Sequence, residues 1–439
     1  MNRKHKKILY RASIVLLWLA VWQLAALWVD NDILLAGPAA TLCTLLQKIV
    51  QPTFWRTVIT SFLRIAVGFS AGMFAGLLLA AFSARWRLLE DVLFPVMALI
   101  KAVPVASFVV LFLIWWRSNV LASVISFCVV MPNLYVNTLE GLKSADRELL
   151  EMAGLYRVPA WNRFFYIYRP ALRPFLDSSI RISVGMSWKS GVAAEVIGTP
   201  AFSIGEGLYM SKIYLDTAGV LAWTAVVILV SVLFEWGVLR LWALFQRWQP
   251  PCRPSKAFGS ADTPEGDGSL RLRELTKRYH GKTVLDKVSG VYQRGEIKYF
   301  VSPSGSGKTT LFRLIAGLEP PDEGSVEPDD LSLTYVFQED RLCEDYSALR
   351  NVEMVTGDRE LARKHLMCLL EPEDLDRPCR ELSGGMKRRV AVARAFAVPA
   401  QATLLDEPYT GLDEKNRERV KAYIEEYGRE RILLIATHI

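Results

Sequence analysis

The sequence is poor in the residues that build metal centres and covalent cross-links. It has four His and six Cys among 439 residues. The cysteines show no Cys-x-x-Cys pair and no accompanying His in a zinc-binding pattern, so we expect neither a zinc site nor a disulfide framework. The six are Cys43, Cys128, Cys252, Cys343, Cys368 and Cys379.

Charge is also scarce, and its distribution is uneven. Only 22% of the residues are charged, 51% are hydrophobic, and the mean hydropathy is +0.21, which excludes disorder for most of the chain. Residues 1–250 hold 23 Lys and Arg against 13 Asp and Glu, whereas residues 251–439 hold 29 against 32. A nucleic-acid-binding protein would concentrate its basic excess in a soluble domain. We therefore expect no nucleic-acid partner.

Long runs without charge predict that the first half spans a membrane. Four runs have 18 to 22 uncharged residues, enough to cross about 30 Å of hydrocarbon at about 1.5 Å per residue. The first run is too long for the apolar part of a signal peptide and lacks a clear cleavage site, so we expect an uncleaved span. The runs are 12–29, 65–84, 118–139 and 217–234; a fifth candidate, 92–116, contains only Lys101, and a sixth, 176–198, carries four charged residues.

The basic residues of the short loops predict the orientation of these spans. Basic residues gather before the first span and in the segment 140–174, whereas the loop 199–216 has only Lys212. With six spans, both ends of a membrane domain 1–248 then lie in the cytoplasm. We expect a multi-pass protein of the cytoplasmic (inner) membrane, in contact with the lipid bilayer.

Small and charged residues inside the spans have alternative interpretations. Gly68, Gly72 and Gly76 share one helix face and favour close helix packing. Lys189 and Glu195 either line the route of a charged solute or form ion pairs between helices. Arg181 is expected near the cytoplasmic end, in a structural role.

A second domain, 270–439, follows a linker at 249–269 that has four prolines and no hydrophobic period, so we expect this linker to be a flexible tether. In this domain an apolar strand candidate, 297–301, leads into a glycine-rich loop and then an amphipathic helix, which is the context of a phosphate-binding loop. Glycines let backbone N–H groups surround phosphates, Lys308 neutralises charge, and Thr309 can hold Mg²⁺. The candidate ATP-binding residues here are Ser304, Gly305, Ser306, Gly307, Lys308, Thr309 and Thr310.

A pair of carboxylates follows the next strongly apolar strand, 402–405. Asp406 at the strand end can hold Mg²⁺, and Glu407 beside it can act as a general base toward the attacking water. A solvated acidic pair is the alternative, which the preceding strand and the following Pro408 disfavour.

Five ordered motifs make the second half resemble ABC ATPases. Val-Phe-Gln-Glu at 336–339 is similar to the glutamine loop, Leu-Ser-Gly-Gly-Met at 382–386 to the signature motif, and Asp-Glu-Pro at 406–408 to the Walker B motif. Gly-Leu-Asp at 411–413 is similar to the D-loop, and Thr437-His438 to the switch-histidine loop. The resemblance implies that Gln338 reaches the metal and that His438 contacts the γ-phosphate. It also implies that Tyr279 stacks on adenine, and that Ser383, Gly384 and Gly385 bind the ATP of a second copy across a dimer interface.

The segment 140–174 resembles the coupling loop of binding-protein-dependent ABC importers. Glu151-Met152-Ala153, Ile167 and Pro170 follow that family's spacing, whereas Arg157 stands where the family has Gly and Arg169 where it has Leu. In the family this loop docks into a groove of the ATPase. A bulky Arg157 at a tight turn implies a compensating change on the ATPase.

Together these features predict an all-α, six-span membrane domain of the type I importer kind, followed by an α/β P-loop ABC ATPase domain that looks short at its C-terminus. The resemblance implies an ATP-driven homodimeric importer of a small anionic solute of the nitrate, sulfonate or taurine type. A separate extracytoplasmic solute-binding protein would deliver the solute. Two alternatives stay open: an ABC exporter half-transporter, and a weakly hydrolysing, ATP-responsive membrane sensor.

Overall fold

The computed structural model describes residues 3–254, 269–303, 305–328 and 331–437. The chain forms two compact units. The helical unit comprises Met1–Ser144 and Leu172–Trp248, and the mixed unit comprises Ala145–Ala171 and Gln249–Ile439. The expected domain limits differ from these units in two respects. The segment 145–171 belongs to the mixed unit although it lies between membrane-span candidates in the sequence, and the described part of the expected linker, 249–254, belongs to the mixed unit as well.

The helical unit contains a helix at each of the six predicted spans. Three of its helices, α3, α6 and α11, are long and apolar enough to cross a membrane. The apolar part of α1 is shorter, at Ser13–Val29, and α9 contains the four charged residues noted above, so the number of crossings remains a prediction. The helices are α1 (Arg3–Val29), α2 (Pro38–Ile49), α3 (Pro52–Arg85), α4 (Arg87–Ala102), α5 (Val105–Trp115), α6 (Ser118–Lys143), α9 (Arg169–Gly198), α10 (Ile204–Ile213) and α11 (Thr217–Arg247).

The fifth span candidate, 92–116, is broken in the structure. The structure has two helices there, α4 and α5, bent by 102° at a short break. Pro104 directly precedes α5, and proline cannot donate the backbone hydrogen bond that would continue α4. Pro95, by contrast, lies inside α4 without ending it.

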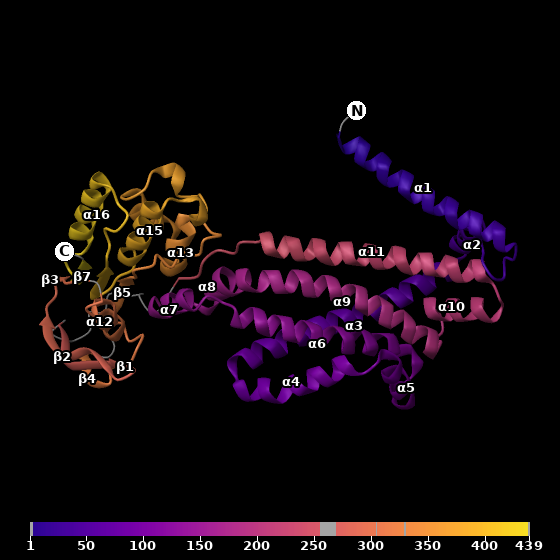
Figure 1. Ribbon diagram of the computed structural model, residues 1–439, viewed down its shortest axis with the longest axis horizontal. Helices are drawn as coiled ribbons and strands as arrows, with labels where there is room; N and C mark the ends of the chain where they lie inside the picture. Colours follow the sequence, from indigo (N-terminus) through magenta and orange to yellow (C-terminus); the bar gives the residue numbers. More distant parts are fainter. Residues whose placement is uncertain (1–2, 255–268, 304, 329–330, 438–439) are drawn as a thin grey trace. The chain divides into compact units, whose positions relative to one another are not determined.

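Glycines allow α3 and α6 to pack closely, as expected. A Cβ at Gly68 would lie 2.2 Å from the backbone oxygen of Ser123, and one at Gly76 would lie 2.7 Å from that of Met131. The helices α3, α6, α9 and α11 run alongside one another (Figure 1). Between them, Ile65, Phe69 and other apolar side chains form the main core of this unit.

The charged residues of the sixth span candidate have different environments. Glu195 is fully buried, accepts a hydrogen bond of 2.7 Å from Ser61, and lies 3.8 Å from the guanidinium of Arg64. This arrangement supports the interhelical alternative for Glu195. Arg181 pairs with Glu235 at 3.5 Å, and Lys189 is exposed.

The mixed unit contains two sheets with helices. A parallel sheet has the strand order β3-β7-β6-β5, and an antiparallel sheet has the order β2-β1-β4. Its elements are α7 (Arg147–Leu155), α8 (Ala160–Arg163), the π-helical η1 (Phe164–Tyr168), β1 (Leu270–Tyr279), β2 (Lys282–Tyr292), β3 (Ile297–Val301), α12 (Lys308–Ile315), β4 (Glu323–Glu327), β5 (Leu333–Val336), α13 (Ala348–Thr356), α14 (Arg359–Met367), the 3₁₀ turns η3 (Pro372–Asp374) and η4 (Cys379–Glu381), α15 (Gly384–Phe396), β6 (Ala402–Asp406), α16 (Glu414–Tyr427) and β7 (Ile432–Thr437).

The parallel sheet positions the predicted motifs along one edge. Val301 of β3 pairs with Thr437 of β7, and Asp406 of β6 pairs with Ala436 of β7. On the other side of β6, Val336 of β5 pairs with Leu405. The carboxyl ends of β3, β5, β6 and β7 therefore meet, which is where ligands bind in open α/β sheets.

Candidate nucleotide site and coupling loop

The loop between β3 and α12 has the backbone geometry of an anion cradle. Gly305 and Gly307 have φ values of +80° and +90°, a conformation that favours glycine. Gly307 directly precedes Lys308, the first residue of α12. The Ser302 and Ser306 hydroxyls are 2.6 Å apart. The Lys308 ammonium donates to the Ser302 carbonyl and, at 3.2 Å, to the Pro303 carbonyl.

A cavity of about 220 Å³ opens at this loop. It brings together most of the predicted phosphate and metal residues with Gln338 and Glu407, which come from two other strand ends. Ser304 and His438, which were also predicted, lie outside the described residues. The lining consists of Val284, Gly305, Ser306, Gly307, Lys308, Thr309, Thr310, Gln338 and Glu407.

Asp406 faces the start of α12 from the end of β6. It is buried, and its carboxylate accepts hydrogen bonds from Thr309 at 2.8 Å and from Tyr335 at 3.2 Å. Burial raises the pKa of Asp406, against the lowering effect of these two hydrogen bonds. A hydroxyl and a carboxylate oxygen beside a phosphate-binding loop are ligands that suit Mg²⁺, so the residues present fit the expected ion.

Glu407 has an unusual backbone conformation at the cavity. Its φ is +53°, a region that non-glycine residues rarely adopt and that often occurs at functional sites. Its N–H donates to the Ala436 carbonyl at 3.0 Å, and its carboxylate accepts a hydrogen bond of 3.1 Å from Thr410. These contacts hold the carboxyl group beside the phosphate loop.

Arg388 on α15 holds the glutamine loop. Its guanidinium donates to the Phe337 carbonyl at 2.6 Å and to the Gln338 carbonyl, and it pairs with Asp340 at 3.2 Å. The backbone of Gln338 is therefore fixed, while its side chain is exposed toward the cavity.

The signature residues are separate from the cavity of their own chain. Ser383 caps α15 by accepting a hydrogen bond of 3.3 Å from the Met386 N–H, and Ser383 and Gly384 are exposed. A Cβ at Gly385 would lie 2.9 Å from the Gly411 carbonyl, so the signature motif and the D-loop are in close contact. Within the described residues, Ser383, Gly384 and Gly385 are absent from the cavity lining.

Tyr279 ends β1 with its ring partly exposed rather than packed in the core. It is 38% exposed, and its hydroxyl hydrogen-bonds the carboxylate of Glu319. Tyr279 does not contribute to the lining of the cavity, as far as the structure describes it. An exposed ring with an anchored hydroxyl suits a stacking role.

The loop 145–171 packs on the rest of the mixed unit. Met152, Ala153, Tyr156 and Val158 are buried. The Tyr156 hydroxyl donates to the Tyr335 carbonyl at 3.0 Å. Because the Tyr335 hydroxyl bonds Asp406, one residue contacts both this loop and the candidate metal site.

Glu151 of α7 joins two arginines of the mixed unit. Its carboxylate lies 3.1 Å from Arg341 and 3.4 Å from Arg313. Burial alone would raise the pKa of Glu151, but the hydrogen bonds from Arg341 and Arg313 lower it below its ordinary value. The ionised carboxylate is therefore the form that binds both guanidinium groups.

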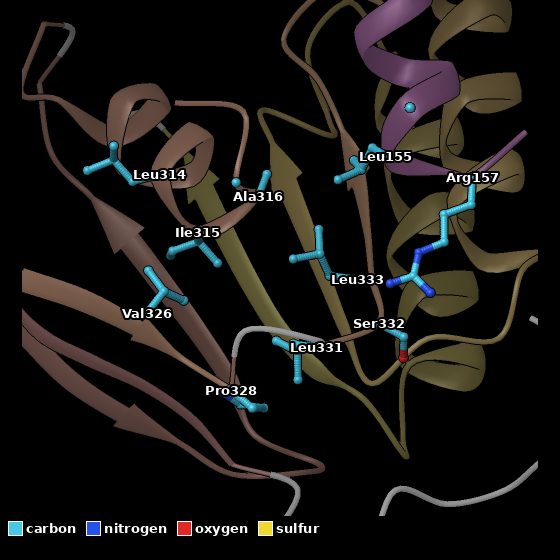
Figure 2. Close-up of a pocket in the computed structure, with 12 residues that line it drawn as sticks. Leu155, Arg157, Leu314, Ile315, Ala316, Val326, Pro328, Leu331, Ser332 and Leu333 are labelled. Carbon is cyan, nitrogen blue, oxygen red and sulfur yellow. The ribbon is translucent and has the colours of Figure 1, made fainter. Parts of the chain in front are cut away.

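The two departures from the family pattern are accommodated in different ways. Arg157 has a φ of +47°, and its side chain extends along a cavity of about 300 Å³ lined also by Leu155, Leu333 and Ser332 (Figure 2). Arg169 is buried and donates to the Tyr346 hydroxyl at 3.1 Å. The ATP-binding domain thus accommodates Arg157 with a cavity and Arg169 with the hydroxyl of Tyr346.

The start of the linker, 249–254, is a fixed strap rather than the flexible tether that its prolines predict. The buried Asn162 side chain donates to the Arg253 and Met354 carbonyls and accepts from the Arg253 N–H, all at 2.9 Å. The Tyr166 hydroxyl donates to the Pro250 carbonyl at 2.6 Å. The strap and the loop 145–171 are thus bonded to each other and to α13.

The sequence alone did not identify several residues that contact the loop 145–171 or the motifs around the nucleotide cavity. Arg313, Glu319, Tyr335 and Arg388 lie outside the short motifs, and only their spacing from a motif gave a signal. Arg313 follows Lys308 on the same helix, and Tyr335 precedes Gln338 of the glutamine loop by three positions.

Comparisons with known proteins agree with this arrangement. Residues 285–410 match the family model of the ABC transporter. Residues 72–241 match the model of the binding-protein-dependent transport system inner membrane component.

Among curated relatives, the aliphatic sulfonates import ATP-binding protein SsuB 1 of Burkholderia lata is 38% identical over 187 residues, which is 40% of this chain and 58% of that protein. SsuB 3 of Rhodococcus jostii is 35% identical over 198 residues, covering 43% of this chain and 74% of that protein. A solved structure of a putative ABC transporter ATP-binding protein from Pyrococcus furiosus has 25% identity, a TM-score of 0.36, and coverage of 39% of this chain and 92% of that chain.

The chain spans 58% and 50% of the length of the first two curated relatives it matches. One relative above 30% identity is nonetheless covered over 74% of its length, and the two family models match separate halves of the chain. The chain therefore belongs to the ABC transporter family, and it joins a binding-protein-dependent inner membrane component and an ABC ATP-binding domain in one polypeptide.

Proposed function

We propose that two copies of this chain form an ATP-driven importer of a small anion, which a separate solute-binding protein delivers at the outer face of the inner membrane. The main support is the loop 145–171, which leads directly into membrane-span candidates. Its Glu151 and Tyr156 are bonded to Arg341, Arg313 and Tyr335 of the ATP-binding domain. A movement of the ATP-binding part would therefore pull on the membrane helices that flank this loop.

The cavity at the glycine-rich loop supports ATP binding. Lys308 and the backbone N–H groups that open α12 would bind the phosphates, and Tyr279 would stack on the base. Thr309, Asp406 and Gln338 would hold Mg²⁺, which supplies positive charge to the phosphate oxygens. Glu407 would accept the proton of the attacking water, and His438 would contact the γ-phosphate.

The position of the signature residues supports a dimer. Ser383 and Gly384 are exposed at the N-terminus of α15, whose positive end favours a phosphate, yet they do not line their own cavity within the described residues. They would instead close the ATP site of the second copy. Mixed dimers with Lys308→Ala in one chain and Ser383→Arg in the other should then keep one intact site, whereas dimers with both changes in each chain keep none. Equal activity loss in both kinds of dimer would contradict this arrangement.

The proposed substrate class rests on relatives and on charge. The curated relatives are named for the import of aliphatic sulfonates and of sulfate or thiosulfate. The exposed Lys189 on α9 offers a cation to such an anion. Nitrate, sulfonates and taurine are the candidates to test.

The direct test measures ATP hydrolysis by the full chain in liposomes, with and without candidate solute-binding proteins loaded with these anions. We expect stimulation by one binding protein and complete loss of turnover with Glu407→Gln, because the general base is removed. Absence of hydrolysis from an intact dimer would contradict the proposal and favour an ATP-responsive sensor. Hydrolysis that no binding protein stimulates, with solute carried outward, would favour an exporter.

A further inference from the structure

Glu319 connects the candidate base-stacking residue to the helix that follows the phosphate loop. One of its carboxylate oxygens accepts the Tyr279 hydroxyl, and the other lies 2.5 Å from Nε of Arg313 on α12. Burial raises the pKa of Tyr279, and the Glu319 carboxylate raises it further. The hydroxyl therefore stays protonated and donates a hydrogen bond to Glu319.

Arg313 contacts two carboxylates at once. While Nε pairs with Glu319, Nη1 lies 3.4 Å from Glu151 of α7. The planar guanidinium presents its donors in fixed directions, so a stronger contact with one carboxylate weakens the contact with the other. Arg313 also lies on α12, which begins at Lys308 of the phosphate loop.

The line of contacts is partly shielded from water and balanced in charge. The side chains of Arg313, Glu319 and Glu151 are 21%, 25% and 19% exposed, and Arg341, which also binds Glu151, is 5% exposed. Two partly buried carboxylates thus face two partly buried guanidinium groups, and the exposed Arg147 also lies 3.4 Å from Glu151. Partly buried pairs of this kind are screened less by salt than exposed pairs.

We propose that Tyr279, Glu319, Arg313 and Glu151 form one line of hydrogen bonds through which the adenine end of the bound nucleotide is coupled to α7. Glu319 is a positioning residue: it holds the Tyr279 ring in place for stacking and competes with Glu151 for Arg313. At its α7 end the line meets the glutamine loop, because Glu151 also binds Arg341, which pairs with Glu339 at 3.7 Å and lies over the Phe337 ring. This inference rests on the proposed binding of ATP.

Coupling of this kind is reciprocal. If base stacking changes the strength of the Arg313–Glu151 contact, then a change in that contact alters the affinity for the base by the same coupling free energy. Removing the Glu151 charge lets Arg313 pair more fully with Glu319, which draws that carboxylate from the Tyr279 hydroxyl. The ring is then held less firmly, and ATP binds more weakly.

The test is a double-mutant cycle on the full-length protein in nanodiscs. The dissociation constant of ATP is measured by calorimetry in EDTA, so that hydrolysis does not interfere. Glu151→Gln removes the charge at one end, and Tyr279→Phe removes the hydroxyl at the other but keeps the stacking ring. We expect Glu151→Gln to raise the dissociation constant about three- to tenfold in the natural protein, and to change it less than twofold in the Tyr279→Phe background.

Two controls make the result specific. Glu323→Gln removes a nearby carboxylate that pairs with Arg278 at 2.9 Å and should leave the dissociation constant of ATP unchanged. Inorganic tripolyphosphate has no base, so its binding should not respond to Glu151→Gln.

Two results would contradict the proposed coupling while leaving ATP binding intact. One is an equal change in the dissociation constant of ATP on Glu151→Gln in both backgrounds, and the other is an equal change in the dissociation constant of tripolyphosphate. Failure of the natural protein to bind ATP would instead overturn the proposed function, and the inference with it.

Discussion

Inside each of the two units, a different kind of contact holds the elements together. In the helical unit, α3 and α6 approach so closely that glycine is required at Gly68 and Gly76, and the main core is apolar. In the mixed unit, the loop 145–171 is held by carboxylates, guanidinium groups and an amide, including Glu151, Arg341 and Asn162. Shape fixes the first arrangement, and directional polar contacts fix the second. The polar contacts of the mixed unit are more easily rearranged by a charged ligand than the close apolar packing of the helical unit.

The largest expected effect tests the dependence of the helical unit on shape. Gly68→Ala places a methyl group against the Ser123 carbonyl, where the backbone cannot move aside. We expect a loss of about 3 kcal/mol or more and a sharply reduced yield of monodisperse protein in detergent. Gly185→Ala is the matched control, because the described structure has no atom within 4 Å of a Cβ there. Equal yields of the two variants would show that close packing is not required.

The second prediction tests the polar contacts of the mixed unit. Asn162→Ala leaves the Arg253 N–H and the Met354 carbonyl without their partner, at a cost of about 2–4 kcal/mol for several buried groups. Hydrogen exchange should report loss of protection at the Arg253 amide. Asn416→Ala serves as control, since the hydrogen bond described for Asn416 uses its backbone N–H. Unchanged protection at Arg253 would mean that the strap is held by other contacts.

The third prediction separates stability from function within the mixed unit. Because burial raises the pKa of Asp406, its charge opposes folding at neutral pH. Asp406→Asn keeps one acceptor oxygen, which can take the hydrogen bonds of both Thr309 and Tyr335, but removes that charge. We expect the melting temperature to rise by roughly 2–4 °C, while the affinity for Mg²⁺ with ATP falls. A lower melting temperature would contradict this account of the buried carboxylate.

The smallest expected effect concerns pH. Burial lowers the pKa of His365 to about 4, and its ring lies 2.7 Å from the Tyr423 hydroxyl. A base whose pKa is lower in the folded state contributes stability that is complete above its unfolded pKa of about 6.5 and is lost as the pH falls toward 4. Between pH 7 and pH 6 the loss should stay below about 1 kcal/mol. His365→Phe should remove this part of the pH dependence of thermal unfolding, and an unchanged dependence would assign it to other groups.

Much of the fold follows from local sequence patterns. The apolar runs located helices at all six span candidates, with two helices at 92–116. The glycine spacing predicted that another helix packs closely on α3, because periodicity carries that information, but it did not identify α6 as the partner. The bend of 102° between α4 and α5 could not be read from the sequence, because proline is tolerated in many membrane helices and packing decides the outcome.

The candidate site was predicted less completely than its motifs suggest. The phosphate loop, Asp406 and Glu407 meet at one sheet edge because parallel strands place their carboxyl ends together. Residues such as Glu319, Tyr335 and Asn162 are ordinary in sequence, and they gain a role only when distant segments come together. The linker strap was missed for the same reason, since its partner Asn162 lies 91 positions earlier.

The central claim is that the loop 145–171 docks on the rest of the mixed unit through Glu151. Zero-length carbodiimide coupling in the full-length Arg313→Lys variant tests it most directly, because the reagent joins only a carboxylate and an amine already in contact. The account predicts a cross-linked peptide that joins Glu151 to position 313, identified by mass spectrometry. Coupling of position 313 to Glu319 alone, with none to Glu151, would contradict it.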